Sequence, residues 1–104
     1  MITAVGICRA SPGQEEELGR RMSALVAPTS EEPGCLRYDL YRSDTDPSLW
    51  VLLEAWQSQA HLDAHVETLH FQAFLARKDE VMLGVPDNYR LSLVLRSRRD
   101  LETE

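Results

Sequence analysis

Three histidines lie close together in the second half of the chain, His61, His65 and His70, and His65 has the most informative setting. It follows Leu62 by three residues, so both side chains lean toward the same, inward face of a helix. An unperturbed histidine has a pKa near ~6.5 and can accept a phenolic proton near neutral pH. His65 is therefore the first candidate for a general base. The alternative is a histidine whose hydrogen bonds serve only the sheet or a partner subunit.

Four further side chains are candidates for the same site. Trp56 ends an apolar run and can stack on an aromatic ring, border a pocket or fill the core. Tyr38 lies on the apolar side of a predicted strand, where its hydroxyl can bind a substrate oxygen or pack inside the core. His70 can reach the mouth of a cavity or stay at the surface. Arg77 can contact a substrate oxygen or be a solvated helix arginine beside Lys78.

The histidine spacing also raises the question of a metal. His61 and His65 are four residues apart, which suits two ligands on one helix face, and His70 is near in sequence. A metal site needs a third or fourth ligand and supporting groups, and the sequence has no HExxH motif and no cysteine cluster. We therefore expect no metal.

The composition is that of one folded domain with an acidic balance. The 104 residues are 43% hydrophobic and 27% charged, which favours a packed core over disorder. Seventeen acidic and eleven basic residues give a net charge of −6. This argues against nucleic acid and against a membrane surface as partners, since both attract basic patches. Two cysteines, no signal-like segment and no apolar run of about 20 residues lead us to expect a cytoplasmic protein.

The elements that would position the candidate residues follow from the spacing of apolar side chains. Residues 1–9 carry β-branched side chains at alternate positions, which predicts a strand. Ser11 can cap a helix that has Pro12 at its first position and three glutamates in its first turn. Apolar residues continue at helical spacing to Val26, and Pro28 is expected to end or distort that helix.

The rest of the chain predicts a hairpin, an interrupted helical region and a last strand. The predicted elements are a strand over 35–42, a strand over 49–56, a helix capped by Ser58, a helical stretch with apolar residues from Phe71 to Met82, and a strand over 89–95. The resulting order is βαββαβ, which is the ferredoxin-like α+β arrangement.

This topology has two consequences. The first and second strands are not neighbours in such a sheet, so Cys8 and Cys35 would lie too far apart for a disulfide. The strand over 49–56 is apolar on both sides, which means that both its faces are covered. Helices cover one face of a two-layer domain. We therefore expect a second copy of the chain on the other face.

Several short motifs occur in order along this pattern. They are Pro12-Gly13 before a helix with an acidic start, Glu32-Pro33-Gly34-Cys35-Leu36-Arg37-Tyr38 at the second strand, Glu54-Ala55-Trp56 at the end of the third, His65 nine residues later, and His70-Phe71-Gln72-Ala73-Phe74 at the next helical piece. In this order they resemble the antibiotic biosynthesis monooxygenase family. The resemblance covers nearly the whole chain as one domain, 1–104, with a charged tail over about 97–104.

The resemblance implies a homodimer whose two sheets face one another as a dimeric α/β barrel, with a cavity between sheet and helices in each subunit. It also implies a monooxygenase without metal, flavin or other cofactor. An electron-rich aromatic, such as a quinol, an anthrone or a polyketide-like compound, is deprotonated and reacts with O2 itself. The protein would supply the pocket, with His65 and Trp56 as catalytic residues and Tyr38, His70 and Arg77 as substrate-binding residues.

Other functions are known on the same scaffold, and the scaffold alone does not decide among them. One alternative is a non-catalytic dimeric protein that binds a small ligand or responds to stress. Relatives that degrade haem have an asparagine in the first strand and a later histidine, but here the first strand has no asparagine and Leu75 stands at the histidine position. Isomerisation of a phosphorylated sugar-like compound would need a phosphate cradle, which the sequence does not offer.

Overall fold

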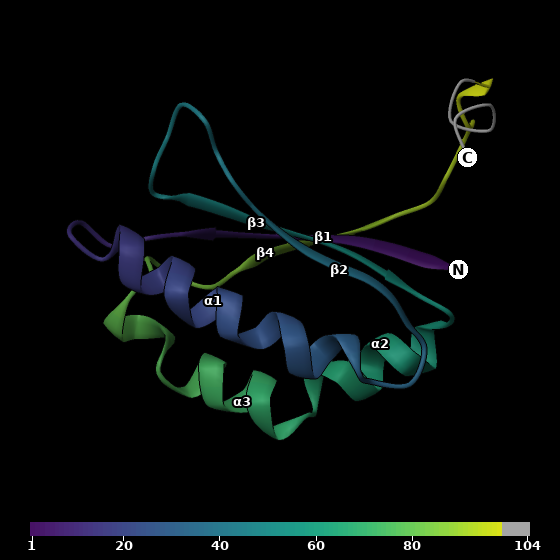
Figure 1. The fold of residues 1–104 in the computed structure, drawn as a ribbon, viewed down its shortest axis with the longest axis horizontal. Coiled ribbons are helices and arrows are strands. Elements are labelled where there is room, and N and C mark those ends of the chain that lie inside the picture. The colour runs from purple at the N-terminus through teal and green to yellow at the C-terminus, as the bar shows by residue number, and fades with distance from the viewer. Residues whose placement is uncertain (99–104) are drawn as a thin grey trace.

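The strands form one antiparallel sheet in the order β2-β3-β1-β4, and the helices pack on one face of it (Figure 1). The computed structural model describes residues 1–98, so most of the predicted tail lies outside the described residues. The elements are β1 (Ile2–Arg9), α1 (Glu15–Ser30), β2 (Cys35–Arg42), β3 (Leu49–Trp56), α2 (Gln59–Val66), α3 (Leu69–Ala76), a 3₁₀ turn (Lys78–Glu80) and β4 (Asp87–Leu91). The predicted ferredoxin-like fold is confirmed.

The two cysteines are free thiols, as predicted. Strand β3 separates β2 from β1, and the register sets Cys8 opposite Trp50 and Cys35 opposite Trp56, at opposite ends of β3. Burial, with a smaller effect of the Asp87 carboxylate, raises the pKa of the Cys8 thiol to about 12. Cys8 is therefore a small apolar core residue rather than a nucleophile.

The core lies between the sheet and α1. Leu18, Met22 and Leu25 follow one another at helical spacing on α1 and are buried. A glycine allows the helix to approach the sheet closely, because a Cβ at Gly19 would collide with the ring of Trp50. The amphipathic pattern of α1 therefore fixes which side of the sheet is covered.

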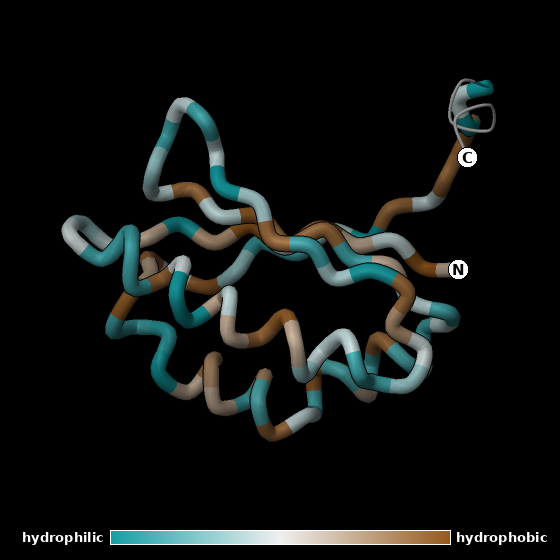
Figure 2. Tube along the Cα trace, viewed as in Figure 1, coloured by the Kyte–Doolittle hydropathy of each residue, from teal (hydrophilic) through white to brown (hydrophobic). Residues whose placement is uncertain are grey.

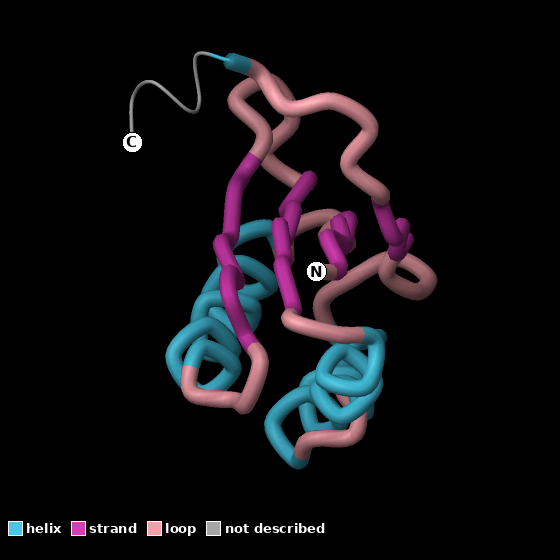
Figure 3. Tube along the Cα trace, turned by 90° about the vertical axis from the view of Figure 1, so that its right-hand side faces the viewer, coloured by secondary structure: helices cyan, strands magenta, loops and turns pink. Residues whose placement is uncertain are grey.

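The opposite face of the sheet is open, since no helix of residues 1–98 lies on it (Figure 3). Hydrophobic residues recur along the strands (Figure 2). Val5 pairs with Leu53 on one side and Tyr89 on the other; Tyr41, opposite Val51, and Leu91, opposite Thr3, lie on the same face. Tyr41, Tyr89 and Leu91 are 49%, 56% and 48% exposed. A second copy on this face stays a prediction.

Helix α1 differs from the prediction at both ends. It begins at Glu15 rather than at Pro12, because Gly13 has a φ of 85° in the left-handed region and breaks the helical backbone. The predicted cap by Ser11 is therefore wrong, although three glutamates do occupy the first turn. At the other end the helix runs through Pro28 for two more residues.

The second helical region is interrupted as predicted. Ser58 caps α2 by accepting a hydrogen bond from the backbone N–H of His61 at 3.3 Å, and Thr68 caps α3 in the same way. Val81 and Met82 were expected in the helical stretch that begins near Phe71. They instead follow the 3₁₀ turn, and both are buried there. Within residues 1–98 no helix has the length and apolar character needed to cross a membrane.

The last strand is shorter than the predicted range of 89–95. Strand β4 ends at Leu91, which pairs with Thr3 next to the start of β1. Beyond this point β1 offers almost no further backbone to pair with, so residues 92–97 leave the sheet. Leu95 is accordingly 86% exposed.

Candidate active site

Four ring side chains from different elements meet near the C-terminal end of α2. His65, on α2, is 1% exposed. Its imidazole centroid lies 4.8 Å from the ring of Phe71 on α3, 4.9 Å from Trp56 on β3 and 5.2 Å from Tyr38 on β2. The three aromatic rings surround the imidazole with apolar surface and keep bulk water away from it.

A single carboxylate makes the polar contact to this imidazole. Nδ1 of His65 lies 3.0 and 3.1 Å from the two carboxylate oxygens of Glu32, whose side chain is 11% exposed. Glu32 lies in the turn between α1 and β2, where Gly34 has a φ of 80° and the ring of His61 fills the space that a Cβ would occupy. The tight turn can therefore close against α2 with Glu32 beside His65.

The contact with Glu32 determines which nitrogen of His65 carries the proton. An ionised carboxylate only accepts hydrogen bonds, so Nδ1–H donates to Glu32 and the neutral imidazole keeps its lone pair on Nε2. Nε2 is buried and has no hydrogen-bond partner within the described residues. A histidine that a carboxylate holds through one nitrogen, with the other nitrogen free, has the arrangement of a general base.

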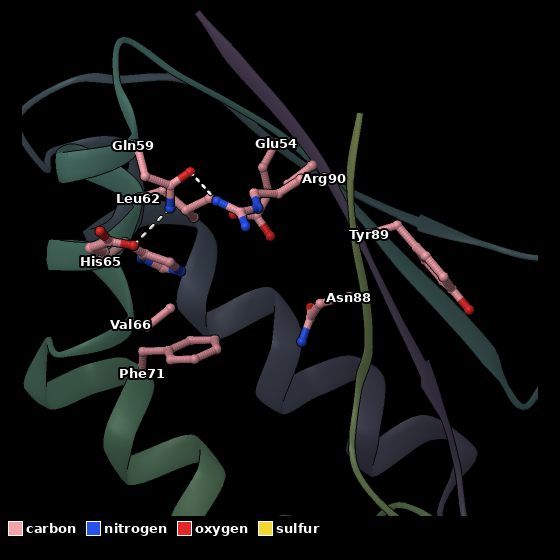
Figure 4. Close-up of a pocket in the computed structure, with 11 residues that line it drawn as sticks. Glu54, Gln59, Leu62, His65, Val66, Phe71, Asn88, Tyr89 and Arg90 are labelled. Atoms are coloured by element: carbon pink, nitrogen blue, oxygen red, sulfur yellow. Dashed lines mark hydrogen bonds between the residues drawn. The ribbon is translucent and has the colours of Figure 1, made fainter. Parts of the chain in front are cut away.

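A cavity of about 280 Å³ opens beside this cluster, between the helices α2 and α3 and the sheet (Figure 4). Leu62 and Phe71 line its apolar side, and the side chains of Glu54, Asn88 and Arg90 provide its polar side. The far edge of the imidazole is turned toward this space (Figure 4). The volume lies near the lower end of the range of about 300–1,000 Å³ that is typical of ligand pockets.

Glu54 is a buried carboxyl group in the cavity wall, 7% exposed. Its Oε1 accepts a hydrogen bond from the indole N–H of Trp56 at 3.0 Å. Burial raises the pKa of Glu54, and the charge of Glu32 adds to this, while Trp56 and His65 act in the opposite direction. The raised pKa favours the neutral acid, which can donate a hydrogen bond or a proton.

Tyr38 lies behind the imidazole and is 3% exposed. Its hydroxyl has no partner in hydrogen-bond geometry within residues 1–98. Burial raises the pKa of Tyr38 far above the usual range, reinforced by Glu54 and Glu32 and slightly offset by Thr29. The phenol is therefore neutral and acts at most as a hydrogen-bond donor.

His70 contacts the same carboxylate from the other side. Its Nε2 lies 2.6 Å from Oε2 of Glu32, and the hydroxyls of Thr29 and Thr68 are each 3.3 Å away. The His70 side chain is 29% exposed and lines a second cavity of about 350 Å³. His70 thus belongs to the hydrogen-bond network of His65 but faces a different space.

Glu32, His65 and His70 together offer three ligand atoms within 4.8 Å of one another. Two imidazoles and a carboxylate are a donor set that zinc or ferrous iron accepts. In this structure the same atoms are joined by hydrogen bonds. A cation there would take the lone pair of Nδ1 on His65 and leave the proton on Nε2, which would remove the basic atom from the first cavity.

Arg77 lies apart from this cluster. Its side chain is 68% exposed, forms an ion pair with Glu80 at 3.0 Å and borders the second cavity. The structure therefore brings together His65, Trp56 and Tyr38, connects His70 to them through Glu32, and leaves Arg77 outside. The roles predicted for these residues remain predictions.

Sequence analysis missed several residues of the cavity. Glu32 appeared only as part of a turn motif, and nothing in its spacing pointed to a histidine thirty-three residues later. Asn88 and Arg90 belong to the last strand, where they alternate with Tyr89. This alternation places both on the helix-covered side, although every residue of β4 is exposed. The two-residue period was the signal that could have identified them.

Comparisons with known proteins agree on one family. The sequence model described as antibiotic biosynthesis monooxygenase matches residues 1–77. YcnE of Bacillus subtilis, provisionally named a monooxygenase, is 31% identical over 93 residues, which cover 89% of this chain and 98% of that protein. YgiN of Escherichia coli K12, provisionally named a quinol monooxygenase, is 29% identical over 84 residues, which cover 71% of this chain and 81% of that protein.

A longer relative and a solved structure extend the comparison. The chain spans 55% of the length of the uncharacterized protein sll1783 of Synechocystis, with 27% identity over 81 residues. The crystal structure of PA3566 from Pseudomonas aeruginosa has a TM-score of 0.85 and 33% sequence identity, and the match covers 90% of this chain and 94% of that one. The arrangement of strands and helices described above is thus the fold of this solved relative.

Proposed function

The chain belongs to the antibiotic biosynthesis monooxygenase family, and from this we propose that it oxidises an electron-rich aromatic of the quinol, anthrone or polyketide type with O2, without a cofactor. One observation carries the proposal. The imidazole of His65 is oriented by Glu32 and lines a cavity with an apolar wall, and its buried Nε2 has no hydrogen-bond partner within the described residues. Such a nitrogen can take the proton that activates a phenol or an anthrone toward oxygen.

The proposed reaction begins with proton transfer from the substrate to Nε2 of His65. The resulting imidazolium keeps its Nδ1–H on the Glu32 carboxylate, which stabilises the positive charge in a site with little water. The substrate anion then supplies the electrons that reduce O2. For a methylene group between two rings, one oxygen atom ends in the new carbonyl and the other leaves as water with the two hydrogens.

Glu54 is the proposed acid of the same site. It lines the same cavity as His65, and its raised pKa favours the protonated form. A neutral carboxyl group can hydrogen-bond to reduced oxygen and supply a proton when the oxygen–oxygen bond breaks. Trp56 was predicted as a catalytic residue. Its indole N–H donates to Glu54 and its ring packs on His65, so the role proposed here is to position both groups.

The proposal includes a homodimer built on the open face of the sheet. Tyr41, Tyr89 and Leu91 expose apolar surface there, and a second sheet packed against them would remove it from water. Sedimentation should then give about twice the 11.8 kDa of one chain. A stable monomer at micromolar concentration would contradict this assembly. The free thiols of Cys8 and Cys35 fit the cytoplasmic location that forms part of the proposal.

The experiment that tests the function is oxygen consumption by chelator-treated protein with a panel of hydroquinones and anthrones. We expect uptake above the autoxidation of each compound, and we expect chelator to leave it unchanged. No uptake across the panel would contradict the oxygenase. In that case the ligand-binding alternative predicts that some of the same compounds still raise the melting temperature of the protein under anaerobic conditions.

A further inference from the structure

Arg90 is an unusual residue in the wall of the first cavity. It is the fourth of the five residues of β4, opposite Ala4 of β1, and its side chain extends toward α2 (Figure 4). There its NH1 donates a hydrogen bond to Oε1 of Gln59. The acceptor is a neutral amide, and this exposed guanidinium has no carboxylate within ion-pair distance in the described residues.

Up to residue 91 the other basic side chains are paired. Within residues 1–91 each of them except Arg90 forms an ion pair with a carboxylate of the described chain. These pairs are Arg9–Asp46, Arg20–Glu17, Arg21–Glu17, Arg37–Asp39, Arg42–Glu16, Arg77–Glu80 and Lys78–Asp79. In a chain with a net charge of −6, a guanidinium without a carboxylate at the edge of a cavity indicates a place for an anion.

Gln59 is fixed so that it presents its oxygen to Arg90. Its Nε2 donates to Oδ1 of Asp63 at 2.7 Å, which sets the orientation of the amide. Asp63 also lines the cavity, but its carboxylate accepts the hydrogen bond from Gln59 and forms no ion pair with Arg90 in the described part of the chain. A ligand carboxylate could replace the amide oxygen and accept two parallel N–H bonds from the guanidinium, which a single amide oxygen cannot do.

Arg90 and the proposed base lie at different ends of the same cavity. The partner of Arg90, Gln59, precedes His65 by six residues on α2, which corresponds to about 9 Å along a helix. Leu62 and Phe71 provide an apolar wall next to this stretch. An aromatic compound of one or two rings can span that length with its plane against the wall. Glu54 also lines the cavity, and its pKa is raised, chiefly by burial, which weakens its repulsion of an anion.

We infer that this cavity binds a hydroxylated aromatic carboxylate, whose hydroxyl meets Nε2 of His65 and whose carboxylate is bound by Arg90. That the bound ligand is then oxidised rests on the proposed function, but the recognition of its carboxylate can be tested by binding alone, without turnover. Arg90 is thereby a specificity-determining residue, which selects substrates that carry a negative charge at the end opposite to the reacting hydroxyl.

The test is calorimetric binding under anaerobic conditions with two probes of nearly equal shape, 3,4-dihydroxybenzoate and the neutral 3,4-dihydroxybenzamide. Because the inference needs a hydroxyl opposite the charge, the 4-hydroxyl of each probe lies opposite the carboxylate or amide. Wild-type protein should bind this benzoate about tenfold or more tightly than its amide, because a charge-assisted pair adds to the shared contacts. Arg90→Met should remove this preference and leave the affinity for the amide unchanged, and Arg90→Lys should keep part of it. Rising salt should weaken the preference.

The matched control is Arg77→Met, an exposed arginine of the second cavity, which should leave the preference intact. Equal affinity of wild type for both probes, no binding of the benzoate, or a preference that survives in Arg90→Met would each overturn the inference. A melting curve for Arg90→Met confirms that the variant is folded. If the benzoate preference depends on Arg90 but no compound supports oxygen uptake, the inference stands and the proposed function fails. If compounds support oxygen uptake but the protein shows no preference for the charged probe, the proposed function stands and the inference fails.

Discussion

The two cavities described above differ in how completely their polar groups are paired. Within the described residues, the first contains the imidazole of His65, whose Nε2 has no partner, and the guanidinium of Arg90, which has no carboxylate partner. The second is lined by basic side chains that already have acidic partners. These are Arg20 with Glu17, Arg21 with Glu17 and Glu80, Arg77 with Glu80, and His70 with Glu32.

This difference indicates where a ligand gains binding energy. A polar ligand in the second cavity would have to replace ion pairs that exist already, whereas in the first it would satisfy groups that lack a partner. A buried polar atom without a partner costs about 1–3 kcal/mol, a cost that a ligand can relieve. The larger space is thus not the better site. Polar groups without a hydrogen-bond or ion-pair partner distinguish the two cavities better than volume does.

Replacing the base should give the largest effect. His65→Gln keeps a polar side chain of similar size but has no basic nitrogen. Oxygen uptake with a quinol that the wild-type protein oxidises should therefore fall by roughly 10²–10⁴-fold. Sedimentation of the variant should match wild type, because His65 lies on the helix-covered side of the sheet. Unchanged turnover would remove His65 from the mechanism and with it the main distinction between the cavities.

Glu32 should have the next largest effect. Glu32→Gln can place an amide N–H against Nδ1 of His65, which would move the imidazole proton to Nε2 and block the base. We expect a loss of about 10–100-fold in kcat, since orientation and tautomer are both disturbed. Glu31→Gln, at the exposed preceding residue, is the matched control and should keep full activity. Equal kcat values for the two variants would contradict the orienting role of Glu32.

Glu54 allows a test through stability. Its folded-state pKa is raised, so its favourable contribution is complete below the unfolded pKa of about 4.3 and is lost as pH rises through the folded pKa. Glu54→Gln keeps the acceptor for Trp56 and cannot ionise. The melting temperature of the variant, relative to that of wild type at the same pH, should therefore rise as pH increases from 4 to 8. A constant difference across this range would show that Glu54 ionises normally.

The smallest effect is expected in the second cavity. Arg77→Gln breaks an exposed pair with Glu80, which contributes at most about 1 kcal/mol to stability. Oxygen uptake should change by less than about twofold, because Arg77 does not line the first cavity. A large loss of kcat/KM would support the predicted contact of Arg77 with a substrate and would contradict the functional difference between the two cavities.

Local patterns were sufficient to predict the fold. Alternation over 35–42 and the apolar run over 49–56 identified strands correctly, and the cap at Ser58 began a helix as expected. Errors arose where one residue depends on distant partners. The left-handed Gly13 delays α1, and the limited length of β1 ends β4 at Leu91. Neither property is encoded in the local spacing.

The site was predictable only in part, for the same reason. Trp56 and His65 follow one another on consecutive elements, so their proximity could be expected, and the structure places their rings 4.9 Å apart. Glu32 comes from the turn between α1 and β2, and Arg90 from the last strand. Their approach to the cavity depends on how the layers pack, which no periodicity in the sequence determines.

The most direct test of the account is the ¹⁵N NMR spectrum of the His65 side chain before and after anaerobic addition of a quinol. For the free protein, the account predicts a neutral imidazole with its proton on Nδ1. When the quinol binds, the imidazole should become imidazolium, and the deprotonated quinol cannot react further without O2. An Nε2 that is already protonated in the free protein, or an imidazole that stays neutral with quinol bound, would contradict the claim that His65 is the base.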